Sequence, residues 1–341
     1  MPNCTVCNRS VWMRSACEKC HSLVCSDCRN YALVSPEKMT QVSAVCRACF
    51  RANVTLDLST NVEAYGPEKG TALSVLLVHG GGSCRSMYRH LAHFLVANSD
   101  GKIRCVLMDL PGHGGRMDEP ATIENCVAAV KQVIDTEAVP THSGIPPVYL
   151  GGSFGGYVGM KFVATYPAAV SGVILACCAQ NTGIGSSLKA RMAMNIMEFM
   201  SQHVISASQM VSGMMRMAVS HKHLDLVDVA EGAQTGWYFH QSVAFAKLLK
   251  SATLVECMRA YHNAAPYGGR VLYTNGADDH RDTLTALLDL APNPQAASSI
   301  LYEHTDHFFS HDERVRERFE KDVLNFCVES ISSRTADNVT H

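Results

Sequence analysis

The chain has 341 residues, of which 47% are hydrophobic and 18% charged, with a net charge of -2 at pH 7 and a pI near 6.7. This length predicts two domains with a sizeable core, and the small negative charge argues against nonspecific nucleic-acid binding. No apolar run typical of a secretory signal or a membrane span occurs in the sequence. We therefore expect the 15 cysteines to be thiols or metal ligands in the cytoplasm.

Four Cys-x-x-Cys pairs lie within the first fifty residues: Cys4/Cys7, Cys17/Cys20, Cys25/Cys28 and Cys46/Cys49. Each pair can supply two thiolates to a tetrahedral zinc site, so the eight cysteines predict two structural Zn²⁺ ions. A segment of this size also buries too little apolar surface to fold without metal. Residues 1–51 are called the cysteine module below.

The detailed spacing resembles the FYVE zinc-finger family over about residues 4–50. The run from Cys17 to Cys28 is similar to the two central knuckles of that family, and Val45-Cys46-Arg-Ala-Cys49-Phe50 is similar to its closing one. The resemblance implies cross-braced ligation. One ion would be held by Cys4, Cys7, Cys25 and Cys28, and the other by Cys17, Cys20, Cys46 and Cys49.

The cysteine module departs from the family at the positions that bind phosphatidylinositol 3-phosphate. Trp12 is not followed by an aspartate three residues later, the stretch before Cys17 holds only Arg14, and Ala44 stands where the family has an arginine. With two zinc ions and eight thiolates the module is nearly neutral, which makes a poor anchor for an anionic membrane. The sequence argues against phosphoinositide binding and favours a structural role or a protein partner. Peripheral binding to endosomal membranes is the alternative location.

From residue 53 the pattern changes to alternating strands and helices. Two short antiparallel strands are expected at 54–58 and 61–65, followed by a buried strand at 73–78. Further apolar runs follow at 103–108, 148–150, 170–175, 271–273 and 300–302. This alternation predicts an α/β fold with a mostly parallel sheet over residues 53–330.

Three of these strands end in recognisable motifs. The strand at 148–150 runs into Gly151-Gly152-Ser153-Phe154-Gly155, which has the Gly-x-Ser-x-Gly pattern of a nucleophile elbow. The strand at 73–78 ends in His79-Gly80-Gly81-Gly82, called the glycine loop below. The strand at 103–108 ends in Asp109-Leu-Pro-Gly-His-Gly114. Together these features resemble the α/β-hydrolases.

The resemblance implies a Ser-His-Asp triad in the order nucleophile, acid, base. Ser153 would be the nucleophile and His307, in His304-Thr-Asp-His307-Phe, the base. Asp279 would be the acid, with Asp278 as the alternative. The backbone amides of Gly81 and Phe154 would form the oxyanion hole, while His79 and His113 are expected to be buried structural residues.

A long segment at about 181–266 would form a helical cap over the active site. It is rich in methionine, which suits either a packed cap interior or a soft apolar wall for an acyl chain. The polar tail, residues 331–341, is predicted to be disordered. The linker around residue 52 is short, so the two domains are expected to pack together.

The sequence favours a cytoplasmic serine hydrolase, similar to esterases and lipases, that acts on a small-molecule or lipid ester. Two alternatives are a protein methylesterase, because His-Gly-Gly-Gly also occurs in the phosphatase methylesterases, and a noncatalytic endosomal zinc-finger adaptor. The complete Ser-Asp-His order argues against the adaptor.

Overall fold

The computed structural model describes residues 2–11, 16–25, 30–33, 42–52, 56–137, 144–178, 251–264, 267–279, 284, 287–289 and 291–337. The predicted cap at 181–266 lies outside the described residues except for the part that includes helix α9 (Ser251–His262). Cys28 and Trp12 also lie outside them.

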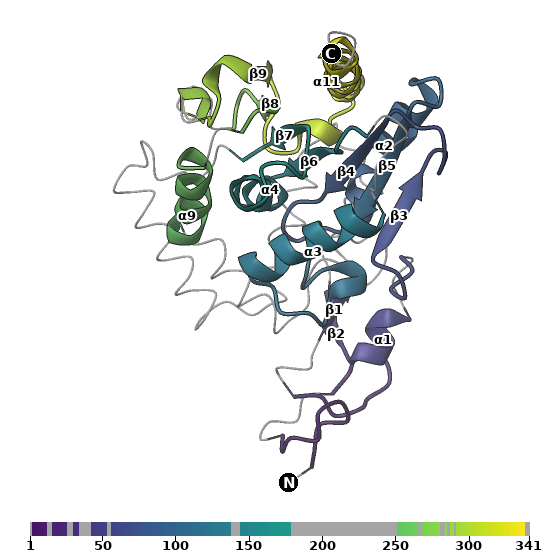
Figure 1. Ribbon diagram of the computed structural model, residues 1–341. Coiled ribbons are helices and arrows are strands. Elements are labelled where there is room, and N and C mark those ends of the chain that lie inside the picture. The colour runs from purple at the N-terminus through teal and green to yellow at the C-terminus, as the bar shows by residue number, and fades with distance from the viewer. Residues whose placement is uncertain are drawn as a thin grey trace.

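A seven-stranded sheet forms the centre of the described structure (Figure 1). Its strand order is β3-β5-β4-β6-β7-β8-β9, and all neighbours are parallel except β3 and β5. The predicted mostly parallel sheet is therefore confirmed. The strands are β3 (Val62–Tyr65), β4 (Leu73–Val78), β5 (Ile103–Met108), β6 (Val148–Gly152), β7 (Gly172–Ala176), β8 (Arg270–Gly276) and β9 (Ala297–Tyr302).

The central strands are buried on both faces, which explains their continuous apolar runs. β4 is buried at every position and has the predicted bounds, as has β5. The strand expected at 54–58 is not present among its described residues, Leu56–Leu58, and β3 pairs with β5 instead. Asp57 explains the difference, because its carboxylate accepts hydrogen bonds from the amide and hydroxyl of Ser59 and so closes a turn.

Helices cover both faces of the sheet (Figure 1). On one face the core contains residues of α3 (Ile123–Thr136), α4 (Phe154–Thr165) and α9. On the other face it contains residues of α2 (Arg89–Ala97) and α11 (Arg316–Asp337). Alternate residues of each strand divide between these two cores, as the pleat requires. Of the helices in the described ranges, none is long and apolar enough to cross a membrane.

The end of α11 differs from the predicted disordered tail. The helix continues through residue 331 to Asp337, and only residues 338–341 of the predicted tail lie outside the described ones. Ile331 packs against the core beneath α2 and α11. Apolar contact thus extends the helix into a stretch whose composition is mostly polar.

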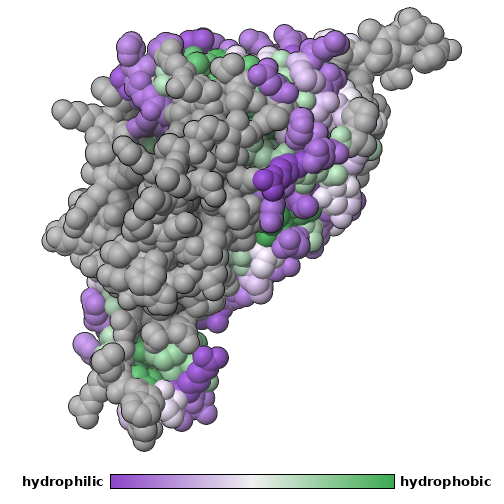
Figure 2. Space-filling model, turned by 90° about the vertical axis from the view of Figure 1, so that its left-hand side faces the viewer, coloured by the Kyte–Doolittle hydropathy of each residue, from purple (hydrophilic) through white to green (hydrophobic). Residues whose placement is uncertain are grey.

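The cysteine module has little regular structure and lies at one end of the molecule (Figure 1). Its elements are the hairpin strands β1 (Asn30–Leu33) and β2 (Val42–Val45) and the short helix α1 (Arg47–Arg51). Hydrophobic and hydrophilic residues adjoin on its visible surface (Figure 2). The cysteines themselves form much of its small core.

Candidate active site

Ser153 lies on a strained turn between β6 and α4. Its backbone has φ 49° and ψ -115°, a region that residues with a side chain rarely adopt. The turn is held by the Ser153 amide, which donates to Ala176 O at 2.7 Å, and by the Gly156 amide, which donates to Ser153 O at 2.9 Å. A serine with a strained backbone at the end of a strand, held by backbone hydrogen bonds to its amide and its carbonyl, is the geometry of a nucleophile elbow.

The glycines that flank Ser153 are required by close backbone packing. A Cβ added at Gly151 would lie 2.4 Å from Gly155 O, and one added at Gly155 would lie 2.6 Å from His79 O. Both distances are shorter than any real carbon–oxygen contact. The elbow therefore sits directly against the start of the glycine loop.

His307 and Asp279 form a hydrogen-bonded pair after the last two strands. His307 Nδ1 lies 2.8 Å from Asp279 Oδ2. Asp279 follows β8 and is 7% exposed, while Asp278 beside it is exposed and faces away from the core. The position of Asp279 is set by backbone bonds, since its amide donates to Gly276 O and that of Asp278 donates to Thr305 O.

Cys177 contacts this pair. It follows β7, has φ 53°, and its thiol donates to His307 O at 2.9 Å. Cys177 Sγ, a nitrogen of His307 and a carboxylate oxygen of Asp279 all lie within 4.8 Å of one another. Burial raises the pKa of the Cys177 thiol well above its usual range, so the group stays protonated and remains a donor. No sequence pattern marks Cys177 for this contact, because a cysteine at the end of a buried strand usually packs in the core.

Ser153, Cys177 and Asp279 thus follow the neighbouring parallel strands β6, β7 and β8. Parallel strands present their carboxyl ends at the same edge of a sheet, so these residues share that edge. Within the described residues, no hydrogen bond joins Ser153 Oγ to His307. Such bonds are often long in enzymes without substrate and shorten in the reactive complex.

The glycine loop lies next to Ser153. A Cβ added at Gly80 would lie 3.3 Å from Ser153 Cβ. Two of its amides have partners, since Gly80 donates to Met87 Sδ at 3.4 Å and Gly82 donates to His113 Nε2 at 3.2 Å. In the part of the chain that the structure describes, the Gly81 amide has no such partner. Phe154, the other predicted donor, is the first residue of α4, so its amide lies at the N-terminal end of that helix.

Two buried histidines connect the glycine loop to the loop that follows β5, residues 109–118, called the β5 loop below. His79 Nε2 accepts from the Leu110 amide at 3.0 Å, and His113 Nε2 accepts from the Gly82 amide. Each ring donates through Nδ1, His79 to Gly80 O at 2.6 Å and His113 to Pro111 O at 3.1 Å. Burial lowers the pKa of His79 to about 4 and that of His113 to about 3, so both rings are neutral.

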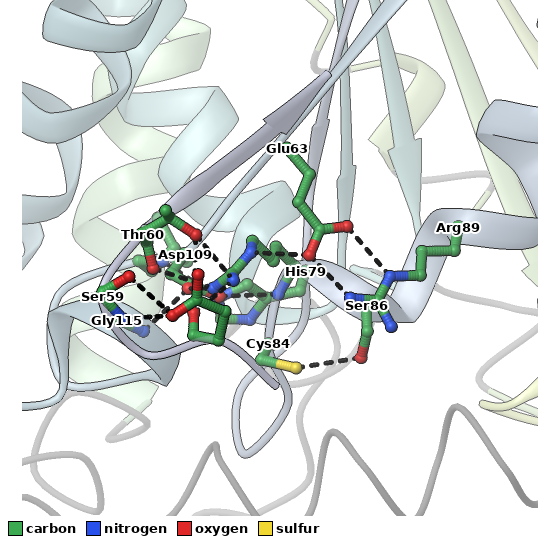
Figure 3. Close-up of polar contacts among 12 residues, drawn as sticks. Ser59, Thr60, Glu63, His79, Cys84, Ser86, Arg89, Asp109 and Gly115 are labelled. Carbon is green, nitrogen blue, oxygen red and sulfur yellow. Dashed lines mark hydrogen bonds and ion pairs between the residues drawn. The ribbon is translucent and has the colours of Figure 1, made fainter. Parts of the chain in front are cut away.

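A buried ion pair joins Arg85, three residues after the glycine loop, to Asp109 of the β5 loop, and Figure 3 shows Asp109 among the polar contacts of this region. Arg85 and Asp109 are both fully buried, and Arg85 Nη1 donates to Asp109 Oδ2 at 2.5 Å. Arg85 also donates to Glu63 Oε1, Thr60 O and Asp57 O. Asp109 accepts further bonds from the amides of Arg85 and Gly115. The sequence did not indicate Arg85, because a single arginine after a glycine loop carries no distinguishing pattern.

The predicted cysteine ligands gather in two clusters. The ligand atoms of Cys17, Cys20, Cys46 and Cys49 lie within 4.8 Å of one another, as do those of Cys4, Cys7 and Cys25. Sulfur atoms around tetrahedral zinc, with Zn–S bonds near 2.3 Å, are about 3.8 Å apart. The measured Cys20–Cys46 and Cys7–Cys25 separations are both 3.6 Å. These residues fit a metal ion of that kind, and the grouping agrees with the cross-braced pairing that the FYVE resemblance implies.

A family model described as "Alpha/beta hydrolase family" matches residues 75–321, which is 247 of the 341 residues. The chain belongs to this family. No match was found among curated protein sequences. The matched α/β-hydrolase region contains Ser153, Asp279 and His307, while the cysteine module lies outside it.

Solved structures show the same fold at low sequence identity. A monoacylglycerol lipase of Paleococcus ferrophilus is 16% identical with a TM-score of 0.53, over 80% of this chain and 100% of that one. An esterase of Exiguobacterium antarcticum is 17% identical with a TM-score of 0.55, over 78% and 94%. MenH from S. aureus is 17% identical with a TM-score of 0.54, over 80% and 99%. At these identities the likeness concerns the fold of this α/β-hydrolase and not its substrate.

Proposed function

We propose that this α/β-hydrolase is a serine esterase in which Ser153 is the nucleophile, His307 the base and Asp279 the acid. The observation that carries the proposal is the 2.8 Å contact between His307 Nδ1 and Asp279 Oδ2, at the sheet edge that also holds the Ser153 elbow. A lipase and an esterase are among the proteins with a similar fold, so this fold is compatible with ester hydrolysis.

The reaction follows from the roles of these three side chains. Ser153 Oγ attacks the ester carbonyl carbon while its proton passes to His307 Nε2, since Nδ1 faces Asp279. The tetrahedral intermediate then expels the alcohol, whose oxygen takes that proton from His307. Water, deprotonated by the same imidazole, attacks the acyl-serine. The acid is released when the bond to Ser153 Oγ breaks and that oxygen takes the proton back from His307. Asp279 stabilises the imidazolium that forms in both steps.

The negative charge on the carbonyl oxygen would be held by the amides of Gly81 and Phe154. The short approach of Gly80 to Ser153 brings the glycine loop beside the nucleophile. The partners of Gly80 and Gly82 fix the two residues on either side of Gly81, so its amide is held in one orientation. Loss of one such donor costs about 3–4 kcal/mol in related enzymes.

The cysteine module is proposed to bind two zinc ions, with Cys4, Cys7, Cys25 and Cys28 on one and Cys17, Cys20, Cys46 and Cys49 on the other. Zinc would supply folding stability to a segment with a very small core. A docking partner for the module, a FYVE-like relationship and a cytoplasmic location stay predictions from the sequence.

The decisive experiment compares the wild type with Ser153→Ala on p-nitrophenyl esters of graded chain length, together with labelling by a fluorophosphonate probe. Ser153→Ala should abolish both hydrolysis and labelling. Full labelling of that variant would refute Ser153 as the nucleophile. The chain-length series would also measure the acyl preference of the site. A protein methylesterase would instead require methyl esters of protein carboxylates and would show no such graded preference.

A further inference from the structure

We propose that Met117 and Asp118 are positioning residues through which the cysteine module braces the catalytic machinery. They are the last residues of the β5 loop, and they contact the module while the start of that loop binds the glycine loop. The inference deepens the proposed esterase function and rests on it. It gives the module a role within the enzyme, in addition to any partner it binds.

Met117 is part of the hydrophobic core of the cysteine module, although it belongs to the hydrolase region of the sequence. It is 2% exposed and packs in one cluster with the buried ligands and apolar residues of the module. That cluster contains Cys4, Val11, Cys17, Val24, Val45, Cys46 and Phe50, with Leu58 at its edge. Met117 therefore shares one hydrophobic core with residues of both cysteine clusters.

Asp118 makes ion pairs with helix α1 of the module. Its carboxylate contacts Arg47, and it accepts from Arg51 Nη2 at 3.1 Å. Cys46 is the N-cap of helix α1, and its sulfur accepts from the Cys49 amide. The two arginines are thus placed by a helix whose first turn carries two of the predicted zinc ligands.

A short series of hydrogen bonds in the β5 loop connects Met117 to the glycine loop. The Met117 amide donates to Gly114 O at 3.3 Å, and the Arg116 amide donates to His113 O at 2.8 Å. His113 Nε2 then accepts from Gly82 in the glycine loop. Only the backbone turn between residues 113 and 117 separates the core of the module from a residue adjoining Gly81.

A second anchor limits the size of the effect. Arg116 donates to Gln132 of α3 at 3.2 Å, so the β5 loop keeps this support as well as the Asp109 bonds to Arg85 and Gly115 when the module is disturbed. Loss of the Met117 contact should therefore loosen the glycine loop without dismantling it. Because an oxyanion hole acts on the transition state, such loosening lowers kcat and leaves KM nearly unchanged.

The test uses the full-length, zinc-loaded protein with Met117→Ala and Asp118→Lys. Each variant should lower kcat on a p-nitrophenyl ester by about 3- to 10-fold, with KM within twofold. Each should also speed deuterium exchange in the peptide that contains residues 79–82. Arg47→Asp combined with Arg51→Asp should restore kcat in the Asp118→Lys background. Asp135→Lys, which breaks an exposed ion pair with Lys131 on α3, is the matched control and should change neither measurement.

Normal kcat and normal exchange at residues 79–82 in both variants would overturn the inference. Asp118 is 44% exposed, so its variant tests the brace even where Met117→Ala fails to fold. An inactive wild type that no fluorophosphonate labels would instead contradict the proposed function. In that case the exchange measurement still decides whether the module braces the glycine loop.

Discussion

His79 and His113 each accept a hydrogen bond from the backbone of the loop that carries the other. The two rings lie 5.0 Å apart and lock the glycine loop and the β5 loop together. Only neutral rings can do this, because a protonated ring presents a donor to an amide that is also a donor. The arrangement therefore ties the geometry of the proposed oxyanion hole to pH.

Stability should fall at acid pH through these two histidines. In the unfolded chain an imidazole binds a proton near pH 6.5, whereas folded His79 and His113 bind one only near pH 4 and pH 3. The unfolded state thus binds more protons below pH 6.5, so the free energy of unfolding falls by about 2 kcal/mol per histidine between pH 7 and pH 5. Urea unfolding at both pH values measures this loss.

His113→Gln is the matching variant, because its side-chain oxygen can still accept from Gly82 but does not titrate. It should reduce the loss between pH 7 and pH 5 by about 2 kcal/mol. His93→Gln, at an exposed residue of α2, is the control and should leave the loss unchanged. An identical pH dependence in wild type and His113→Gln would contradict the neutral buried ring.

Asp279 and Asp278 can be distinguished as the acid by substitution. Asp279→Asn should lower kcat by about 10⁴-fold, because an amide in that position favours the wrong tautomer of His307. Asp278→Asn should stay within twofold of the wild type, since its side chain is exposed. Steady-state kinetics on one p-nitrophenyl ester decides between them. A larger loss in Asp278→Asn would assign the role to the other aspartate.

The Arg85–Asp109 pair should be far more important for stability than its exposed neighbour. Arg85→Met leaves a buried carboxylate without its cation and should lower the free energy of unfolding by about 3–5 kcal/mol. Arg89→Met removes a pair with Glu63 in which the arginine is 29% exposed, and should cost at most about 1 kcal/mol. Urea unfolding at pH 7 measures the loss in each variant. Equal midpoints for Arg85→Met and Arg89→Met would contradict the greater importance of the buried pair.

The metal content of the purified chain should be about two zinc ions per molecule. Cys46→Ser should bind about one, because it breaks the Cys17, Cys20, Cys46 and Cys49 cluster and leaves the other cluster in place. Cys327→Ser, at a buried thiol of α11 far from both clusters, should keep two. Elemental analysis by mass spectrometry measures the content. Two ions in Cys46→Ser would exclude that cluster as a zinc site.

Features that depend on local sequence could be predicted. The bounds of β4 and β5 follow from apolar runs that are buried on both faces, and the Ser153 elbow follows from glycines that the packing demands. The pairing of Asp279 with His307 could be predicted from the order of the strands and the resemblance to α/β-hydrolases. The Cys-x-x-Cys spacing predicts metal ligands, but the way in which they group into the two Sγ clusters is what the FYVE resemblance implies.

Features that depend on contacts between distant parts of the chain could not be predicted from the sequence. The chain at 56–58 reads as a strand, but a carbonyl in it is taken by Arg85, from a loop far along the sequence. Cys177 reads as a core residue, yet its thiol is directed to His307 by the meeting of β7 with the last loop. The partner of the carbonyl at 56–58 and the partner of Cys177 can be found only when the packing of the distant segments is known.

Because Met117 belongs to the core of the cysteine module, the module and the hydrolase region cannot be separated cleanly at residue 51. A cut after Arg51 would split a hydrophobic core, leaving an uncovered thioether on one piece and a gap on the other. Replacement of the front segment by an unrelated one would leave the Met117 side chain without the apolar residues that now cover it.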